Sequence, residues 1–393
     1  MIIQNKEEFA TFVENVKKIN NYTDPIGFAI ARVDRGQINS DKILQASYPV
    51  VNWKENYGSA AVFISALIDS GIEIDFNKSE FVATITKEFV QNCIDKFNPF
   101  LKEAKEDAHK NVQVIKYLNE QSDLNDLFRV VFIFDDVAPK SVEAVYLKLY
   151  ALSLAKADLR SLNLDGAFGI LENVAWSGNT PIELDWLRAN EISLKLNGKY
   201  PNIDSVDKFP RFLQHIIPAN NTRILDSSKV RFGAQLHPGT TVMPGASYIN
   251  FNAGTTGAVM VEGRISSSAI VADGSDIGGG ASILGVLSGT DGNPISIGKN
   301  SLLGANSVTG IPLGDGCIVD AGVTILAGTK IEISQTEIEK INQANDKQLE
   351  SKTIFKGAEL AGLNGIHFRQ DSLSGIIKAY RSTREIRLNQ ELH

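Results

Sequence analysis

Apolar residues in the first 135 positions recur at two alternating spacings, one typical of helices and the other of strands. The helical spacing predicts three helices, over residues 7–19, 81–97 and 105–118. Runs rich in β-branched and aromatic residues predict two strands, over residues 26–33 and 129–136. Together these patterns predict an α/β domain over residues 1–135.

A second α/β region is expected over residues 136–223, as a connector. It begins with Ser141 to Leu159, which is apolar at helical spacing, and Pro139 just before it is typical of a helix start. Residues 163–218 are mixed in pattern and rich in turn formers. We therefore expect one helix followed by irregular α/β structure.

From Val230 onward, apolar residues and glycines recur every six residues. In the first run Gly233, Gly239 and Gly245 are six apart. The apolar positions with the same spacing are Leu236, Val242 and Tyr248, then Val271, Ile277 and Ile283, then Ile297 and Leu303, and last Val319, Ile325 and Ile331. Such a short repeat predicts a parallel β-helix over residues 224–333, in which each hexapeptide forms one face of a triangular coil.

Two segments, 249–268 and 285–294, interrupt this period. Insertions in repeat proteins project from one face and often carry binding function, so we expect both segments to leave the coils. Beyond Ile331 the chain becomes charged and helix-forming over residues 336–349. We expect the C-terminal extension, residues 334–393, to cap the last coil, because an open sheet edge would otherwise remain.

Composition supports the repeat and leaves few charged side chains in it that could take part in catalysis. Of the 32 glycines, 20 lie between Gly233 and Gly328, where only eight side chains are charged. Stacked coils repeat about every 4.8 Å, so like charges on neighbouring coils would face each other, while tight corners favour glycine. The formal charge of −7 and the lack of a basic helix argue against a nucleic-acid partner.

Other functional classes are excluded on similar grounds. No run approaches the roughly 18 apolar residues needed to cross a membrane, so we expect a cytoplasmic protein with no membrane partner. Cys93 and Cys317 are expected to be buried free thiols, and no cluster has metal-ligand spacing. The dispersed histidines His215, His237 and His367 are expected to be structural.

Glu262 and Arg264 are the exceptions to the loss of charge. Glu262 is the single glutamate between Ile192 and Ile331, and Arg264 is the single basic residue between Arg231 and Lys299. Two alternatives remain open for this i, i+2 pair. It forms a surface ion pair, or it joins a carboxylate that handles a proton or an acyl group to a guanidinium that holds an anion.

A run of three glycines follows in DGSDIGGGAS, residues 273–282. It lacks the lysine and the strand-to-helix context of a phosphate-binding loop. We expect these glycines to let a ligand approach the backbone of the coil closely. Their backbone N–H groups are also candidate oxyanion donors.

The motifs SILGVLSG, ISIGKNSLLGANS and LGDGC resemble the hexapeptide acyltransferases, which fold as left-handed parallel β-helices. Further motifs resemble the tetrahydrodipicolinate N-succinyltransferases: NLDGAFGIL, VDKFPR, PGTTVM, NFNAGT, MVEGRIS, DGSDIGGGASI and FRQDS. The resemblance covers residues 141–393. The first 135 residues match poorly, and residues 335–350 have the character of an insertion.

This resemblance implies transfer of a succinyl group from succinyl-CoA to the amine of ring-opened tetrahydrodipicolinate, in lysine and diaminopimelate synthesis. It also implies a homotrimer with active sites between subunits. Succinyl-CoA is then a co-substrate, and no cofactor is bound permanently.

The resemblance also assigns roles to individual residues. Glu262 is the catalytic residue, proposed in the family to form an acyl anhydride, and Arg264 contacts the acyl donor. The other succinyl-CoA contacts fall on Gly279, Ser282, Ala305, Asp320, Ala321, Gly328, Lys356, Arg369, Gln370, Asp371 and Ser372. Asp320 replaces the usual glutamate, and Gln370 and Asp371 replace arginine and asparagine, which removes charge that would contact phosphate.

Several alternatives stay open from the residues themselves. A carboxylate can act as a nucleophile or as a general base that keeps the attacking amine neutral, and the sequence does not decide between them for Glu262. An acetyl-CoA-dependent N-acetyltransferase of the same fold is a second candidate. A non-catalytic trimeric β-helix scaffold is a third, and its carbonic-anhydrase-like form would need interfacial histidines, of which the repeat offers only His237.

Overall fold

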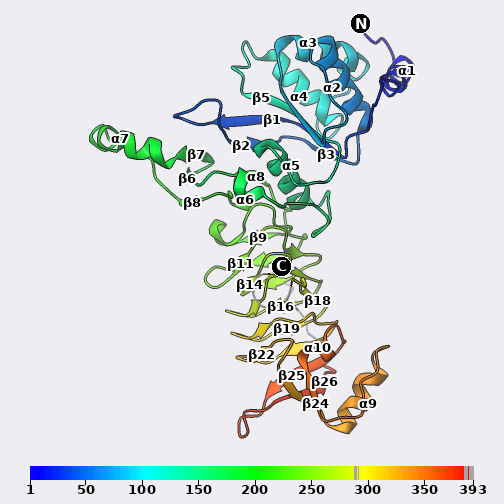
Figure 1. Cartoon of the computed structure of the whole chain (residues 1–393), viewed down its shortest axis with the longest axis vertical. Helices are drawn as coiled ribbons and strands as arrows, with labels where there is room; N and C mark the ends of the chain where they lie inside the picture. The colour runs from blue at the N-terminus through cyan, green and yellow to red at the C-terminus, as the bar shows by residue number, and fades with distance from the viewer. Residues whose placement is uncertain (287–289, 291, 385–387, 389–393) are drawn as a thin grey trace. The chain divides into compact units, whose positions relative to one another are not determined.

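The computed structural model describes residues 1–286, 290, 292–384 and 388 of the chain. Contacts divide the chain into two compact units. The first unit comprises Met1–Ala151 and Ser161–Pro210, and the second comprises Leu152–Arg160 and Arg211–His393. The first is mixed α/β, and the second is a stack of short parallel strands (Figure 1).

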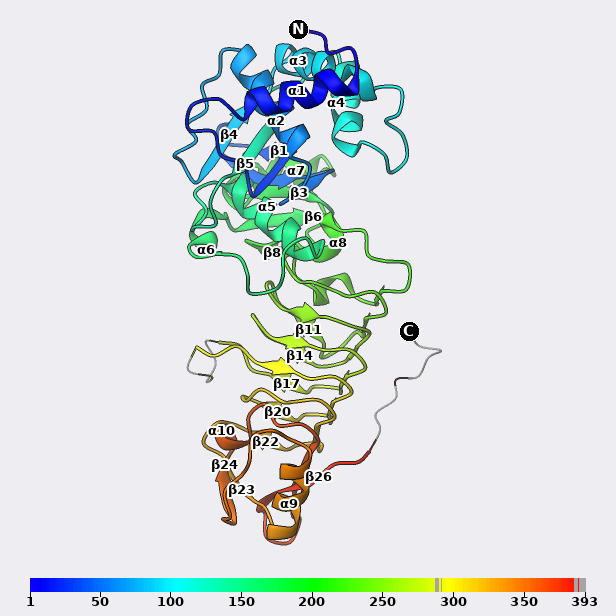
Figure 2. The same cartoon turned by 90° about the vertical axis from the view of Figure 1, so that its right-hand side faces the viewer.

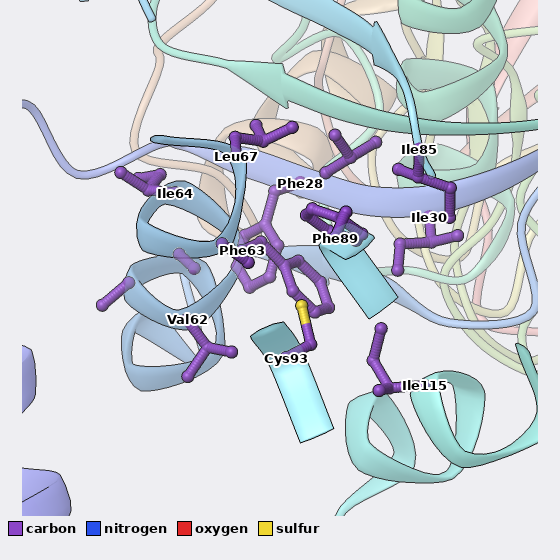
Figure 3. Packing of buried hydrophobic residues seen from close by; sticks show 14 of the residues in the cluster. Phe28, Ile30, Val62, Phe63, Ile64, Leu67, Ile85, Phe89, Cys93 and Ile115 are labelled. Atoms are coloured by element: carbon purple, nitrogen blue, oxygen red, sulfur yellow. The ribbon is translucent and has the colours of Figure 1, made fainter. Parts of the chain in front are cut away.

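An antiparallel sheet with the order β2-β1-β5-β4 forms the centre of the first unit, and β3 also pairs with β1. Its strands are β1 (Gly27–Arg35), β2 (Ile43–Ser47), β3 (Val51–Trp53), β4 (Glu80–Thr84) and β5 (Phe128–Ile133). The helices are α1 (Lys6–Val16), α2 (Tyr57–Asp69), α3 (Lys87–Phe97), η1 (Asn98–Phe100) and α4 (Lys110–Glu120). These helices and the sheet enclose a core rich in aromatic residues (Figure 3).

The structure corrects one of the predicted helices in this unit. Residues 81–97 were expected to be helical throughout, but β4 occupies the start of this range and pairs with β5. The helix α3 begins only after Thr86, whose side chain accepts a hydrogen bond from the backbone of Phe89. The threonine cap separates the two elements, and the apolar spacing did not show it.

The predicted helix at Ser141 to Leu159 is shorter than expected, because α5 is Val142–Ser153. The segment that follows belongs to the second unit. There Arg160 donates from Nε to the carbonyl of Ser268 at 2.6 Å and from Nη1 to Oγ of Ser296 at 3.0 Å. These contacts with neighbouring coils hold the segment in a non-helical path.

The rest of the first unit contains a three-stranded antiparallel sheet with the order β7-β6-β8. Its elements are β6 (Val174–Ser177), β7 (Thr180–Glu183), β8 (Ser205–Asp207), α6 (Ala167–Ile170) and α7 (Leu184–Leu196). Within this unit the buried Lys148 donates to Oδ1 of Asp136 at 2.7 Å and to the carbonyls of Val137 and Asn163. The chain before and after α5 is thereby tied to that helix.

The second unit opens with α8 (Phe212–His215) and η2 (Ser227–Lys229), and then forms three parallel ladders. The first ladder contains β9 (Arg223–Ile224), β10 (Thr241–Val242), β13 (Met260–Val261), β16 (Asp276–Ile277), β19 (Leu302–Leu303) and β21 (Ile318–Val319). The second contains β11 (Tyr248–Ile249), β14 (Arg264–Ile265), β17 (Ser282–Ile283), β20 (Val308–Thr309) and β22 (Thr324–Ile325) (Figure 2). The third contains β12 (Gly254–Thr255), β15 (Ile270–Val271) and β18 (Ser296–Ile297).

The second residue of nearly every one of these strands is buried, which fills the coil with one side chain per face. The predicted repeat is confirmed for most positions, but two residues of its first run are wrong. Tyr248 and Leu236 are only half-buried, and Ile249 is the buried residue at the strand that Tyr248 opens.

The interruption expected at residues 249–268 does not leave the coils. Three of the ladder strands lie within it, and Ile249, Val261 and Ile265 are fully buried. The period fails there because Ile265 follows Val261 by four positions instead of six, so the chain turns one tight corner. Gly263 occupies that corner, where an added Cβ would lie 2.4 Å from the carbonyl oxygen of Ala281. Part of the second interruption, residues 285–294, lies outside the described residues.

The C-terminal extension adds strands to the end of the first ladder. It follows β23 (Lys330–Glu332), and its elements are α9 (Gln335–Gln343), β24 (Ile354–Lys356), α10 (Gly357–Leu360), β25 (Ile366–Gln370) and β26 (Ile377–Arg381). Strand β25 pairs in parallel with β21, which sets the buried Phe368 beside Val319. Strand β26 joins β25 to β23. The last strand of the ladder is therefore covered, as the capping hypothesis expected.

Candidate active site

One corner of the coil, between the first and second ladders, carries the candidate site. In four successive coils the residue after the buried strand residue is Glu262, Gly278, Gly304 and Asp320. Added Cβ atoms at the two glycines would lie 2.7 Å from the carbonyl oxygen of Leu303 and 2.5 Å from the backbone nitrogen of Ala321 respectively. The two middle positions of the corner therefore have no side chain, and an acidic residue lies at each end. At about 4.8 Å per coil, the two acidic residues are roughly 14 Å apart.

Glu262 is fixed at its backbone and half-buried at its side chain. Its N–H donates to the carbonyl of Ile277 at 2.8 Å, and its own carbonyl accepts from Gly280 at 3.4 Å. A Cβ added to Gly279 would lie 3.6 Å from Oε2 of Glu262, so the carboxylate lies directly against that glycine. No ion pair or side-chain hydrogen bond holds this carboxylate within the part of the chain that the structure describes.

Arg264 does not bind Glu262; its guanidinium binds a hydroxyl group. Its Nε and Nη2 both donate to Oγ of Ser282, at 3.1 and 2.8 Å. Ser282 is buried and is the register partner of Arg264 in the next coil. The i, i+2 ion pair that the sequence left open is therefore absent, and the exposed guanidinium remains available to an anion.

Backbone N–H groups without an acceptor in the described chain also lie at this corner. The carbonyls of Gly279 and Ala305 are used by Asn306 and Gly322 of the following coils, at 3.0 and 2.9 Å. Over the described ranges, the N–H groups of Gly279, Ala305 and Ala321 donate to no other residue. Three predicted contact residues thus present one amide donor each, at successive steps of the stack.

The far end of the corner holds a cluster that the sequence did not predict. Oδ1 of Asp320 lies 2.6 Å from Nε2 of His367, and its Oδ2 accepts from Nε of Arg369 at 3.0 Å. His367 was expected to be merely structural. The pairing of β25 with β21 brings it to the corner, and no local motif signals that pairing.

The remaining predicted residues lie elsewhere. Gly328 belongs to the next corner, where α10 begins, and Lys356 is opposite Lys330 in the pair β24–β23. Gln370 is the last residue of β25, and Asp371 and Ser372 begin the turn that follows it.

Asp371 is committed to that turn. It accepts from Lys378 at 2.9 Å and from the backbone N–H groups of Leu373 and Ser374 at 3.0 Å. These bonds, that from Lys378 foremost, hold the pKa of Asp371 well below its ordinary value. In the folded chain this carboxylate is ionised and is hydrogen-bonded to Lys378 and to its own turn.

Two further findings bear on the predicted classes. Among the residues whose placement is described, no helix is long and apolar enough to cross a membrane. The same residues contain no group of three or more histidine, cysteine, aspartate or glutamate side chains placed to hold a metal ion. Cys93 and Cys317 are buried free thiols, as expected.

A stack of hexapeptide coils with an unpaired carboxylate and an exposed guanidinium at one corner is the arrangement expected of the hexapeptide-repeat acyltransferases. Family models make the assignment specific. Residues 7–169 match tetrahydrodipicolinate N-succinyltransferase N-terminal, residues 171–211 match the middle region of the same family, and residues 294–327 match the hexapeptide repeat of succinyl-transferase. The chain belongs to the tetrahydrodipicolinate N-succinyltransferase family.

Individual relatives cover the whole chain. The 2,3,4,5-tetrahydropyridine-2,6-dicarboxylate N-succinyltransferase of Sulfurovum sp. is 68% identical over 392 residues, covering 100% of this chain and 99% of its own. That of Nitratiruptor sp. is 66% identical, covering 100% of both chains. A Campylobacter jejuni crystal structure described as a 2,3,4,5-tetrahydropyridine-2-carboxylate N-succinyltransferase is 56% identical, with a TM-score of 0.93, over 98% of this chain and 100% of its own. The expectation that the first 135 residues match poorly is therefore wrong.

Proposed function

We propose that this chain succinylates the amine of ring-opened tetrahydrodipicolinate with succinyl-CoA, giving N-succinyl-2-amino-6-oxopimelate and CoA, and that the reaction takes place at the Glu262 corner. The N-succinyltransferase activity, in diaminopimelate and lysine synthesis, follows from family membership, because full-length relatives carry it in their names. The observation that supports the location is the carboxylate of Glu262, which is half-buried, free of ion pairs among the described residues, and in contact with Gly279.

Glu262 acts as the nucleophile in this proposal. Its carboxylate attacks the thioester carbonyl, CoA leaves as the thiolate, and a mixed succinyl anhydride forms on the side chain. The neutral amine of the acceptor then attacks the anhydride and loses one proton, which the CoA thiolate takes up, so the carboxylate is restored and the products are the amide and CoA. The N–H of Gly279 is the candidate donor to the oxyanion of the first step, because it lies beside the carboxylate and is not otherwise used.

Arg264 holds the acyl donor. A guanidinium bound on one edge to a hydroxyl keeps its full charge, so it can pair with the free carboxylate of the succinyl group. An acetyl group has no such carboxylate. Pairing of the exposed guanidinium with the succinyl carboxylate would therefore favour succinyl-CoA over acetyl-CoA.

The proposal includes a left-handed coil, a homotrimer and sites shared between subunits. The row of unused N–H groups at an exposed corner supports a shared site, since a neighbouring subunit and the CoA arm would cover it. Mixing Glu262→Gln and Arg264→Ala chains tests this arrangement. If the two residues act from different subunits, co-refolded mixtures regain up to about a quarter of the activity, whereas separately folded variants stay inactive.

Single-turnover thiol release tests the chemistry. With succinyl-CoA and no acceptor, an anhydride intermediate predicts a burst of about one CoA per active site, and hydroxylamine should trap the acyl group. A general-base mechanism predicts no burst. Equal steady-state rates with acetyl-CoA would support the rival acetyltransferase, and no acceptor-dependent release with either thioester would support the scaffold.

A further inference from the structure

His367 connects the cap of the stack to the candidate site. It lies on β25, whose outward side chains alternate with buried ones such as Phe368. Its ring faces Asp320, the corner residue directly after β21, and Arg369 approaches the same carboxylate two residues further along β25. One carboxylate therefore receives donors from two outward residues of the neighbouring strand.

We propose that His367 is a positioning residue for succinyl-CoA binding, which acts by fixing Asp320 so that Asp320 orients Arg369. The proposal rests on the assignment of Arg369 to the CoA site. The imidazole occupies Oδ1 of Asp320 at 2.6 Å, which sets the carboxylate plane so that Oδ2 meets Nε of Arg369 at 3.0 Å. This bond uses only the Nε edge, so the terminal nitrogens stay available to a phosphate.

The exposure of the three side chains agrees with a chain of positioning. His367 is 22% exposed, Asp320 37% and Arg369 59%, so exposure increases from the imidazole outward. An arginine side chain this exposed loses much rotational freedom when it binds an anion. A carboxylate that already holds the guanidinium removes part of that loss before CoA arrives.

The surroundings offer no second acid with the same geometry. The cross-strand neighbours of His367 and Arg369 on β26 are Tyr380 and Lys378. Lys378 donates to Asp371, so that acid is engaged in its own turn. Of the described acidic side chains, Asp320 alone has a hydrogen bond or ion pair with Arg369.

The test compares His367→Phe with His367→Gln, because the amide nitrogen of glutamine can replace Nε2 as the donor. We expect His367→Phe to raise the KM for succinyl-CoA about three- to tenfold while kcat changes less than twofold, and His367→Gln to restore most of the affinity. Tyr380→Phe, on the same sheet face without a contact to Asp320, is the matched control and should leave KM unchanged.

A double-mutant cycle separates positioning from general support of the cap. In an Arg369→Ala background, His367→Phe should have no further effect on KM, because the positioned residue is gone. The same KM increase in both backgrounds, or an unchanged KM in His367→Phe, would overturn the proposal. If His367→Phe does not fold, the cycle is run with His367→Gln and His367→Asn, whose amide is too short to reach, and Asn should behave as Phe. Lack of succinyl-CoA turnover in the unsubstituted chain would refute the proposed function instead.

Discussion

The three consecutive glycines at the corner have different roles, and single alanine substitutions should separate them. At Gly279 an added methyl group meets nothing nearer than Oε2 of Glu262, at 3.6 Å, which is an ordinary contact. At Gly278 it would lie 2.7 Å from the carbonyl oxygen of Leu303. At Gly280 the backbone has φ +73°, and the methyl group would lie 2.3 Å from Oδ1 of Asn306.

These distances give opposite expectations for stability and activity. Gly279→Ala should leave the thermal unfolding midpoint within about 2 °C, yet lower kcat/KM about 100-fold, because a methyl group in the site displaces reacting atoms by about 1 Å. Gly278→Ala should cost about 1–3 kcal/mol through overpacking, and Gly280→Ala about 1–2 kcal/mol for the left-handed backbone plus the clash. For a unit of this size each kcal/mol lowers the midpoint by about 2–4 °C.

The assay is differential scanning calorimetry beside steady-state thiol release for all three variants. Gly278→Ala and Gly280→Ala serve as controls for Gly279→Ala, since they add the same methyl group one residue away. Near-normal activity in Gly279→Ala would refute the placement of the reacting thioester. If the unfolding midpoint falls most in Gly279→Ala, the contacts assigned to Gly278, Gly279 and Gly280 are wrong.

Three further substitutions test other parts of the account. Arg264→Lys should raise the KM for succinyl-CoA about tenfold, because an ammonium cannot bind Ser282 and a carboxylate with the same fork, and the selectivity over acetyl-CoA in thiol release should fall with it. Lys148→Met should lower the free energy of unfolding of the first unit by about 3 kcal/mol in urea titrations, since it leaves Asp136 and two carbonyls without their donor. Burial raises the pKa of Glu143, so the folded chain favours the protonated form of this side chain. The protonated side chain contributes its full stabilisation below the pKa that Glu143 has in the unfolded chain. This stabilisation is lost as the pH rises through the pKa that Glu143 has in the folded chain. Glu143→Gln should therefore increase the free energy of unfolding at pH 7 and change it little at pH 4.

Sequence reasoning located the repeat and singled out Glu262 and Arg264 as candidate site residues, because both features leave a local record. The six-residue period fixes which side chain of each strand is buried, and Glu262 and Arg264 stand out where charge is otherwise avoided. The same period misled at residues 249–268, because a corner shortened to four residues shifts the spacing without leaving the coil. Only the strand register shows that Ile265 continues the stack.

The contacts that sequence missed depend on residues far apart in the chain. His367 reaches Asp320 across 47 positions, through the pairing of β25 with β21. Arg160 meets coils more than 90 residues away, which ends the helix that local spacing would extend to Leu159. Neither contact leaves a periodic pattern in the sequence, so each becomes evident only once the pairing of the strands is known.

The central claim, that succinyl transfer takes place at Glu262, is tested most directly by thiol release from succinyl-CoA in the chain and in Glu262→Gln. The account predicts acceptor-dependent release in the unsubstituted chain, and a loss of about 1,000-fold in kcat for the variant, with the unfolding midpoint unchanged. Release by Glu262→Gln within tenfold of the unsubstituted rate would contradict it.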